Sequence, residues 1–306
     1  MAEDDFDQLL LEIRDGFASL PDKPEETPES ILKALWMMAA GEAKSAELAV
    51  HCELPKLSTP AQDHLQDLIG AWRTGTPLAH LTGRQNFCGM ELLAGPDALI
   101  PRKETEILAT AALDLIARCQ TEHPVIIDVC TGCGNLALLY ASRFPRALVY
   151  GADLSEAAVA LATRNGEFTG LADRVEFRQG NLLEPFADGQ FDQRVDVLSC
   201  NPPYISSKKV SLMPEEISGH EPAMAFDGGG FGISILQKLI TEAVRYIRPG
   251  GYLVFELGLG QGPSIIKKWN GMTGTVMFRD GTMNREMSEP LWPALLLDGA
   301  RNSSLV

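Results

Sequence analysis

Positive charge is scarce in this 306-residue chain, which has 26 lysine and arginine residues against 41 aspartate and glutamate residues. The formal net charge of −15 argues against a long surface that follows a phosphate backbone, although it is compatible with a local basic patch. We therefore expect free nucleic acid to be a poor substrate for this protein.

Long hydrophobic runs are also missing. No stretch of the sequence comes near the roughly 20 consecutive apolar residues that a transmembrane helix needs. The amino end reads MAEDDFDQ, which is acidic where a secretory signal is basic and then apolar. We therefore expect a cytoplasmic protein that has no membrane partner.

Cysteine is sparse, with 6 residues in the whole chain. A reducing compartment favours free thiols, so we assign no disulfide. Cys130 and Cys133 form a C-x-x-C pair, which in other settings suggests zinc or redox chemistry. No second cysteine pair accompanies it and the 5 histidines are scattered, so we discount this interpretation and expect no metal site.

The composition is that of a packed globular protein, with 45% hydrophobic and 22% charged residues. The length exceeds the usual size of one domain, so we expect two units. Residues 1–83 are predicted to form a helical domain, and Thr27 and Pro28 supply an N-cap and a proline at the first helical position. The apolar residues that recur at helical spacing in this part are Ile31, Leu32, Leu35, Met38, Leu65, Leu68, Ile69 and Trp72.

Residues 84–100 have a different texture, with short apolar runs and turn residues that predict a hairpin linker. Residues 101–306 then alternate between strands and helices. The predicted strands are Val125–Asp128, Ala147–Asp153, Val175–Phe177, Val195–Cys200 and Tyr252–Glu256, and the main helices between them are Leu136–Phe144, Glu156–Thr169 and Ser234–Ile247. This alternation predicts an α/β fold, with a Rossmann-like parallel sheet covered on both faces and a ligand site at the carboxyl ends of its strands.

The first predicted strand leads into a pattern that is typical of cofactor binding, VIIDVCTGCGNLALLYA. Gly132 and Gly134 lie between strand and helix, where the backbone can approach a ligand because no side chain intervenes. About 25 residues after Asp128 the second strand ends in Asp153, a spacing at which a carboxylate commonly accepts hydrogen bonds from ribose. Together these features indicate an adenosine-type cofactor, although the glycine loop alone is also compatible with an ordinary turn.

The same loop disfavours two other ligands. It is not the phosphate-binding G-x-G-x-x-G, because Cys130 stands where the first glycine would be, and it contains no Walker-type lysine. A dinucleotide and a nucleoside triphosphate are therefore both disfavoured, and an S-adenosyl ligand, which has no pyrophosphate, fits better. After the third strand, Asn181 and Leu182 occupy a loop that either flanks the adenine ring or is an ordinary turn.

The fourth predicted strand runs directly into the tetrad Asn201-Pro202-Pro203-Tyr204, at the edge of the sheet where ligands bind. The two prolines restrict the backbone, so the loop is stiff. The carbonyl of Pro202 and the Oδ1 atom of Asn201 are two acceptors that can hold both hydrogens of one NH₂ group, and Tyr204 offers a flat face for stacking. A nitrogen held in this way can meet a sulfonium methyl group in line. The alternative is a proline-rich turn that follows a strand.

With these motifs the sequence resembles the HemK-like protein glutamine N5-methyltransferases, which modify peptide-chain release factors. The resemblance covers roughly residues 43 to 261. The matching blocks, in the order of the family, are GTPLAHLTGRQNF, LIPRKETEIL, IIDVCTGCGNLAL, GADLSEAAVALATRN, NPPYI, EPAMAFDGGGFG and GGYLVFELGLGQ. The resemblance implies a class I methyltransferase that uses S-adenosyl-L-methionine, a release factor as its protein substrate, and a helical first domain that helps to dock this partner.

Site residues follow from both lines of argument. By resemblance, Asn201 and Pro202 would grip the glutamine amide and Tyr204 would pack against it, so these three are our predicted catalytic residues. Phe87, which resembles the aromatic wall of the family on the methyl or substrate side, and Pro203 complete the predicted substrate contacts. The predicted cofactor-binding residues at the ends of the strands are Asp128, Thr131, Gly132, Gly134, Asp153, Leu154, Asn181, Leu182 and Asn201. The resemblance adds Arg102 and Glu106, from the block after Ile100.

The sequence departs from the family in two places. Lys103 replaces the second proline of the usual IPRPETE block, which is expected to loosen that segment. Beyond Gly262 the pattern of the expected closing strand is missing, and VMFRDGTMNREMSEPLWPALLL stands in its place.

Three other functions therefore stay open. The first is a small-molecule N-methyltransferase on the same scaffold. The second is a methyltransferase for exocyclic amines of nucleic acids, which the acidic charge disfavours. The third is a binding protein that has kept the fold without catalysis, which the intact tetrad and Asp153 disfavour.

Overall fold

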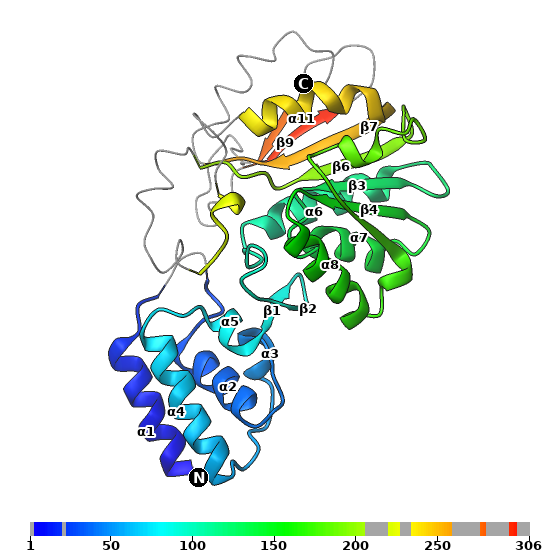
Figure 1. The fold of residues 1–306 in the computed structure, drawn as a ribbon. Coiled ribbons are helices and arrows are strands. Elements are labelled where there is room, and N and C mark those ends of the chain that lie inside the picture. Colours follow the sequence, from blue (N-terminus) through cyan, green and yellow to red (C-terminus); the bar gives the residue numbers. More distant parts are fainter. Residues whose placement is uncertain are drawn as a thin grey trace. The chain divides into compact units, whose positions relative to one another are not determined.

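The computed structural model of this protein describes residues 3–19, 23–205, 220–226 and 234–258 and the strands Val276–Arg279 and Ala294–Asp298. The chain divides into two compact units (Figure 1). The first unit runs to Lys103 and also includes Glu221, and the second unit begins at Glu104. Within the part of the chain that the structure describes, no helix is both long enough and apolar enough to span a membrane.

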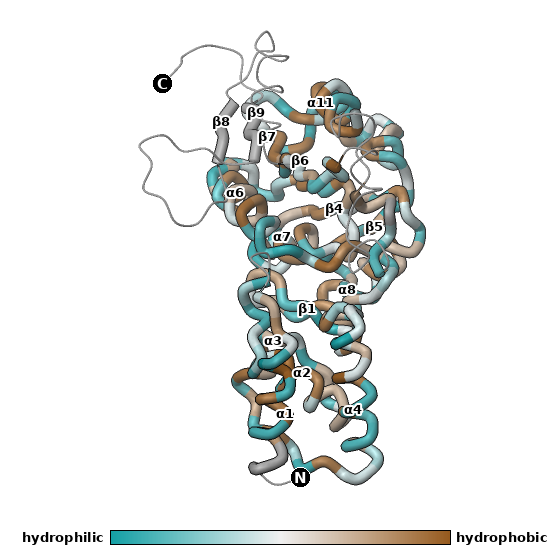
Figure 2. Tube along the Cα trace, turned by 90° about the vertical axis from the view of Figure 1, so that its left-hand side faces the viewer, coloured by the Kyte–Doolittle hydropathy of each residue, from teal (hydrophilic) through white to brown (hydrophobic). Residues whose placement is uncertain are grey.

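The first unit is built mainly from helices. These are α1 (Glu3–Gly16), α2 (Pro28–Ala39), α3 (Ala46–Ala49), α4 (Thr59–Arg73) and α5 (Leu78–Thr82). Figure 2 shows hydrophobic and hydrophilic stretches alternating along α4, as expected for a helix with one buried face, whereas α2 is buried along most of its length. The buried residues include Ile31, Leu35 and Leu65, so the helical periodicity of the sequence is confirmed. Helix α1, whose Ile13 is also fully buried, was not among the elements predicted from the sequence.

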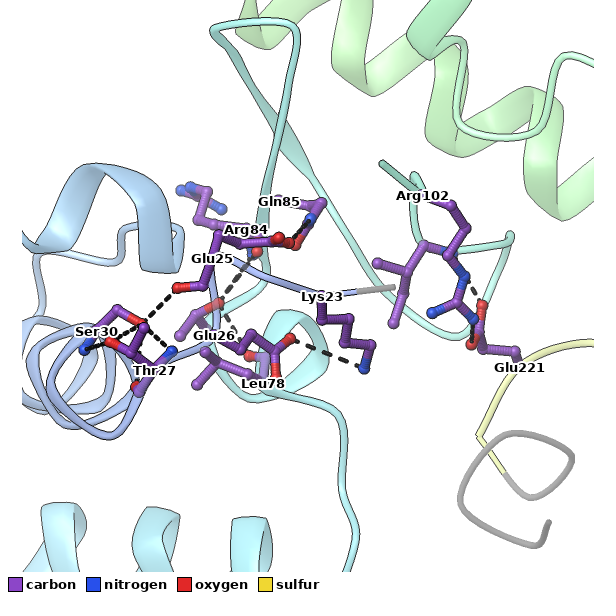
Figure 3. A network of polar contacts seen from close by, with 12 residues as sticks. Lys23, Glu25, Glu26, Thr27, Ser30, Leu78, Arg84, Gln85, Arg102 and Glu221 are labelled. Atoms are coloured by element: carbon purple, nitrogen blue, oxygen red, sulfur yellow. Dashed lines mark hydrogen bonds and ion pairs between the residues drawn. The ribbon is translucent and has the colours of Figure 1, made fainter. Parts of the chain in front are cut away.

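The predicted N-cap of α2 is confirmed as a full capping box (Figure 3). The Thr27 hydroxyl accepts a hydrogen bond from the Ser30 backbone N–H at 3.1 Å, and the Ser30 hydroxyl accepts one from the Thr27 N–H at 2.8 Å. Pro28 occupies the first turn, where its missing N–H would have had no helical partner. This reciprocal cap fixes the start of the central helix of the first unit.

A two-stranded antiparallel hairpin follows the helices within the first unit. Its strands are β1 (Arg84–Phe87) and β2 (Met90–Leu93), and only Cys88 and Gly89 lie between them. Both turn residues have a positive φ, 51° and 81°, which is the combination that a two-residue hairpin turn requires. The positive φ at Cys88 is uncommon for a residue other than glycine.

The segment after the hairpin is tied down by polar side chains. The Arg102 guanidinium pairs with the buried Glu221 carboxylate, whose second oxygen accepts a hydrogen bond from the Ile100 N–H at 3.0 Å (Figure 3). Lys103, at the position of the family's proline, forms a 3.1 Å ion pair with Glu47. A proline could not make this ion pair, so the substitution brings an anchor of its own, although a partly exposed pair stabilises only weakly.

The second unit contains a seven-stranded sheet in the order β5-β4-β3-β6-β7-β9-β8. The strands are β3 (Val125–Val129), β4 (Leu148–Asp153), β5 (Val175–Gln179), β6 (Val195–Cys200), β7 (Ile247–Glu256), β8 (Val276–Arg279) and β9 (Ala294–Asp298). The first five are parallel, as the sequence predicted. From β3 the chain continues to β4 and β5 on one side, and then to β6 and β7 on the other side of β3. The change of side between β3 and β6 creates the switch point at which ligands bind in such sheets.

The closing strands correct one expectation from the sequence. The pattern after residue 262 suggested that the last strand of the sheet was missing, but β9 pairs with β7 and β8 pairs with β9, both antiparallel. Both strands lie beyond that residue. The segment therefore keeps the backbone pairing of a closing pair although it has lost the familiar residue pattern, because a backbone ladder depends little on which polar residues surround it.

Helices cover both faces of the sheet, as predicted (Figure 1). One face packs against α6 (Thr105–Arg118), α7 (Asn135–Arg143) and α8 (Glu156–Phe168). The other face packs against α11 (Ser234–Tyr246) in a buried core that includes Ile127, Leu198, Leu239 and Phe255. The predicted Rossmann-like parallel sheet and its accompanying N-terminal helices are confirmed.

Candidate active site

Four parallel strands of the second unit end side by side. In the sheet register, Val129 of β3 lies between Ala152 of β4 and Cys200 of β6, and Cys200 lies opposite Phe255 of β7. The residues that come next in each chain segment therefore start at the same edge of the sheet. This edge holds the cofactor motif, the acidic residue after the second strand and the proline tetrad.

A buried carboxylate, that of Asp128, holds the loop after β3 through hydrogen bonds. Asp128 is 1% exposed, and its two oxygens accept hydrogen bonds of 2.6 Å from the hydroxyls of Ser199 and Thr131. Burial raises the pKa of Asp128 to about 7, although these two hydrogen bonds act in the opposite direction. With both oxygens bound by protein groups, Asp128 holds Thr131 in place and so shapes the loop.

Asp153 links the loops after β3 and β4. One oxygen of its carboxylate accepts a hydrogen bond from the Gly132 N–H and the other accepts one from the Ser155 N–H, each at 2.9 Å. A carboxylate oxygen has a second lone pair, so both oxygens can still accept from ribose hydroxyls. Burial raises the pKa of Asp153, and the hydrogen bonds from backbone N–H groups oppose that shift.

The two glycines of the loop differ, because one borders open space and the other packs closely against a neighbouring ring. Gly132 has a φ of +54°, and a Cβ atom there would meet nothing within 4 Å, so the space beside this backbone is open. Gly134 has a φ of +83°, and a Cβ atom there would lie 2.8 Å from the Phe177 ring. Cys130 also has a positive φ, 56°, and such strained backbone clusters at functional sites. The loop, its open side and the acceptor Asp153 fit an adenosine-type cofactor.

One thiol of the cysteine pair in this loop, that of Cys133, is fully buried. Burial raises the pKa of the Cys133 thiol to about 12, so this sulfur stays protonated near neutral pH. Among the residues that the structure describes, no group of three or more His, Cys, Asp or Glu side chains could hold a metal ion.

Leu154 and Leu182 flank the same edge from two loops. Leu154 directly follows Asp153 and is 53% exposed, so its apolar side chain is accessible to a ligand at this edge. Leu182 is buried and has a φ of +54°, a second strained residue in a loop at this edge. Asn181 is half-buried beside it, and its carbonyl accepts a hydrogen bond from the Glu184 N–H.

The proline tetrad is held by a chain of hydrogen bonds. The Asn201 Nδ2 atom donates to the Thr105 hydroxyl at 3.0 Å, and this hydroxyl donates to the Glu256 carboxylate at 2.9 Å. The Tyr204 hydroxyl also hydrogen-bonds to Glu256. Since Nδ2 is taken by Thr105, the opposite end of the Asn201 amide, Oδ1, is left to accept from a ligand.

The predicted site residues divide between the two units. The tetrad, Glu106 and the predicted cofactor residues from Asp128 to Leu182 belong to the second unit, and all except Glu106 lie at or just after the strand ends. Phe87, on β1, and Arg102 belong to the first unit, where Phe87 is 1% exposed and Arg102 pairs with Glu221.

Sequence reasoning assigned no role to four polar residues that support the site. Thr105 and Glu256 connect to the tetrad, Ser199 holds Asp128, and the buried Asn165 donates from α8 to the Cys133 carbonyl at 3.0 Å. For two of them the sequence did contain a signal, because an acidic or amide side chain within an apolar stretch indicates a buried polar contact. Glu256 ends an apolar strand at the ligand edge, and Asn165 lies inside a helix that otherwise packs on the sheet.

The chain matches the family model described as "Methyltransferase domain" over residues 120–287. This range contains the loop after β3, Asp153 and the tetrad. Together with the sheet order and the ligand edge, the match makes the protein a class I methyltransferase that depends on S-adenosyl-L-methionine.

Relatives with a shared name narrow this class. The chain is 36% identical over 208 residues to the release factor glutamine methyltransferase of Gloeobacter violaceus, covering 67% of this chain and 71% of that protein. The proteins of the same name from Streptomyces coelicolor and Xylella fastidiosa (strain Temecula1) are 38% and 34% identical, covering 62% and 75% of this chain and 65% and 80% of those proteins. The chain belongs to the release factor glutamine methyltransferase family. Over the first four relatives the match spans 63% to 72% of their length.

A solved structure supports the fold alone. The hMettl16 catalytic domain in complex with a MAT2A 3'UTR hairpin superposes with a TM-score of 0.54, covering 71% of this chain and 78% of that one. Its sequence identity to this chain is 14%, which is too low to carry any argument about the substrate.

Cofactor binding is expected to be independent of metal ions. Asp153 and the backbone of the glycine loop supply the contacts, and the protonated Cys133 thiol is a poor metal ligand. Calorimetry with S-adenosylmethionine and S-adenosylhomocysteine should give the same affinities with and without a chelator. Loss of binding or of turnover on chelation would contradict this expectation.

Proposed function

We propose that this protein transfers the methyl group of S-adenosyl-L-methionine to the side-chain amide nitrogen of a glutamine in a peptide-chain release factor. The observation that carries the proposal is the orientation of Asn201. Its Nδ2 atom is engaged by Thr105, so its Oδ1 atom is available to accept a hydrogen bond from an NH₂ group. The names of the relatives support glutamine in a release factor as the bearer of that group.

The reaction follows from what the tetrad offers. Asn201 Oδ1 and the Pro202 carbonyl each accept one hydrogen of the glutamine NH₂ group, which fixes the plane of the amide. Tyr204 packs against that plane. When bound, the cofactor would supply a sulfonium methyl group, and its transfer to the amide nitrogen would break the carbon–sulfur bond and release the extra proton of the nitrogen to water. Alignment supplies most of the rate, so no strong base is needed.

The cofactor would be held along the edge of the sheet. We infer that Asp153 binds the ribose, that Gly132 and Gly134 let the backbone approach the methionine end, and that Asp128 acts through Thr131. Leu154, Asn181 and Leu182 would flank the adenine ring. In this proposal Asn201 also borders the methyl group, Glu106 supports the site, and Pro203 contacts the acceptor. Phe87 and Arg102, which belong to the first unit, keep the substrate-side and supporting roles that the resemblance implies.

The first unit would contribute to docking of the partner. We propose a helical docking domain at residues 1–83, a hairpin linker at residues 84–100 and a methyltransferase domain at residues 101–306. A release factor works in translation, which implies that the enzyme acts in the cytoplasm. Free nucleic acid is a poor alternative substrate for a chain with a formal net charge of −15.

Methyl transfer to release factors is the direct test. With cofactor labelled in its methyl group, we expect label in a release factor from the same organism, and peptide mass spectrometry should locate it on a glutamine side chain. The matched control is the same release factor with that glutamine replaced by asparagine, which should take up no label. Label in small amines or in RNA with none in the release factor would replace this proposal with the corresponding alternative.

A further inference from the structure

Two buried polar residues outside the tetrad are hydrogen-bonded to it. Thr105, the first residue of α6, is 2% exposed, and Glu256, the last residue of β7, is 5% exposed. The hydrogen bonds run from Asn201 to Thr105 and from Thr105 to Glu256, so they join the loop after β6 to two other elements of the second unit. Buried polar groups need hydrogen-bond partners. Thr105 and Glu256 find theirs in each other and in the tetrad.

The direction of this hydrogen-bond chain is set by the number of hydrogens. An ionised carboxylate only accepts, so the Thr105 hydroxyl must give its single hydrogen to Glu256. The Thr105 oxygen can then only accept from Asn201, and the group that donates is the Nδ2 end of the amide. This leaves Oδ1 facing away from Thr105. The orientation of Asn201 is therefore a consequence of the negative charge on Glu256.

We propose that Thr105 and Glu256 are positioning residues that determine which end of the Asn201 amide is presented to the methyl acceptor. Neither residue needs to touch the acceptor. The identity of that acceptor as a glutamine amide rests on the proposed function, but the orientation of Asn201 is a property of the enzyme alone.

Protonation of Glu256 would reverse the hydrogen-bond chain. Burial, together with the negative charge of the neighbouring Glu104, raises the pKa of Glu256 to about 7, although the hydrogen bonds from Thr105 and Tyr204 act in the opposite direction. A protonated Glu256 can donate to Thr105, whose hydrogen is then free to turn to Asn201. The amide responds by rotating so that Oδ1 accepts from Thr105 and Nδ2 faces the acceptor, where it repels an NH₂ group.

Few groups face Glu256 among the residues that the structure describes. Glu104 and Thr105 come from the start of α6, Tyr204 comes from the tetrad, and the backbone neighbour across the sheet on β9 is Ala294. Glu104 is thus the charged group that faces it among the described residues, and its negative charge opposes the ionisation of Glu256. Asp128 at the same edge also has a pKa of about 7, so a pH profile of the wild type cannot by itself assign the ionisation.

The first test replaces Thr105 with valine, which keeps the shape and removes the hydroxyl. Asn201 then has to leave its Nδ2 donor unpaired whenever Oδ1 faces the acceptor, so kcat should fall about 5- to 100-fold. Cofactor affinity should change less than about 2-fold, because the groups that hold the ribose and the loop are untouched. Thr105→Ser restores the hydroxyl and should recover most of the rate. Thr110→Val is the matched control, because Thr110 lies on the same helix, is exposed, and donates only to a helix carbonyl.

The second test needs no methyl acceptor, so it stands even if the proposed function fails. The ¹⁵N–¹H signals of the Asn201 side chain, assigned by their disappearance in Asn201→Ala, should shift with pH near 7 in the wild type. In Glu256→Gln they should not titrate, because the introduced amide has no proton to lose in this range. In Thr105→Val they should also be insensitive, since the link to Glu256 is broken.

Three results would overturn the inference. The first is a Thr105→Val enzyme whose kcat falls no more than that of Thr110→Val, or whose cofactor affinity falls by as much as its kcat. The second is an Asn201 signal that titrates in Glu256→Gln as it does in the wild type. The third is a fall of kcat at low pH that persists in Glu256→Gln, which would assign this pH dependence to Asp128 and contradict the reversal.

Discussion

Replacing Asn201 with alanine is expected to lower the rate of methyl transfer about 5- to 150-fold and to leave cofactor affinity nearly unchanged. The variant lacks the acceptor for one hydrogen of the reacting NH₂ group. Leaving such a donor unpaired in a buried site costs about 1–3 kcal/mol, and each 1.36 kcal/mol corresponds to about tenfold in rate. Loss of alignment in the stiff loop can add to this effect.

Single-turnover rates at saturating cofactor, measured beside calorimetric affinities for the cofactor, separate the two quantities. A fall in rate without a fall in cofactor affinity supports the role of Asn201 as the residue that holds the NH₂ group of the methyl acceptor. Normal turnover in Asn201→Ala, or a loss of cofactor affinity comparable to the loss of rate, would show that the tetrad does not have this role.

Replacing Asp153 with alanine should have the opposite signature. Its carboxylate can accept from ribose equally in the ground state and the transition state, so its removal weakens binding more than it slows the bound reaction. A hydrogen bond to a charged group contributes about 1.5–3 kcal/mol, which corresponds to roughly 10- to 150-fold in affinity for each hydrogen bond from ribose that the variant cannot form. The Gly132 and Ser155 N–H groups also lose their acceptor, which should loosen the loop.

Asp153→Asn is the conservative control for this second variant. It retains one acceptor oxygen but introduces a donor, so its cofactor affinity should lie between those of the wild type and Asp153→Ala. Calorimetry with S-adenosylhomocysteine measures all three without turnover. Equal affinities for the wild type and Asp153→Ala would exclude Asp153 as the ribose ligand.

Local patterns predicted most of the fold. The strands that lead to Asp128, Asp153 and Asn201 were predictable because a buried parallel strand is a continuous apolar run. The polar residue at the end of each strand marks the edge of the sheet where ligands bind. The cap at Thr27 was predictable because it depends on only a few consecutive residues. Each of these features is encoded within a short window of sequence.

The supporting network was not predictable in the same way. Asn201 and Thr105 are separated by 96 residues, and Thr105 and Glu256 by 151 residues, so no local pattern joins them. Their hydrogen bonds depend on the order of the strands and on the placement of α6 over β6 and β7. The closing strands escaped prediction for a related reason, since β8 and β9 keep their backbone pairing without the residue pattern of the family.

The long sequence separations in this network have a consequence for how the site comes into being during synthesis. The ribosome delivers Asp128 and Asp153 early, and the loop between their strands can close as soon as β3 and β4 pair. Asn201 follows, but its amide has no fixed direction until the end of β7 supplies Glu256. In the order of synthesis, the residues that hold the cofactor therefore come before the residue that fixes the direction of the Asn201 amide. The acceptor side of the site takes its final form only when the last parallel strand joins the sheet.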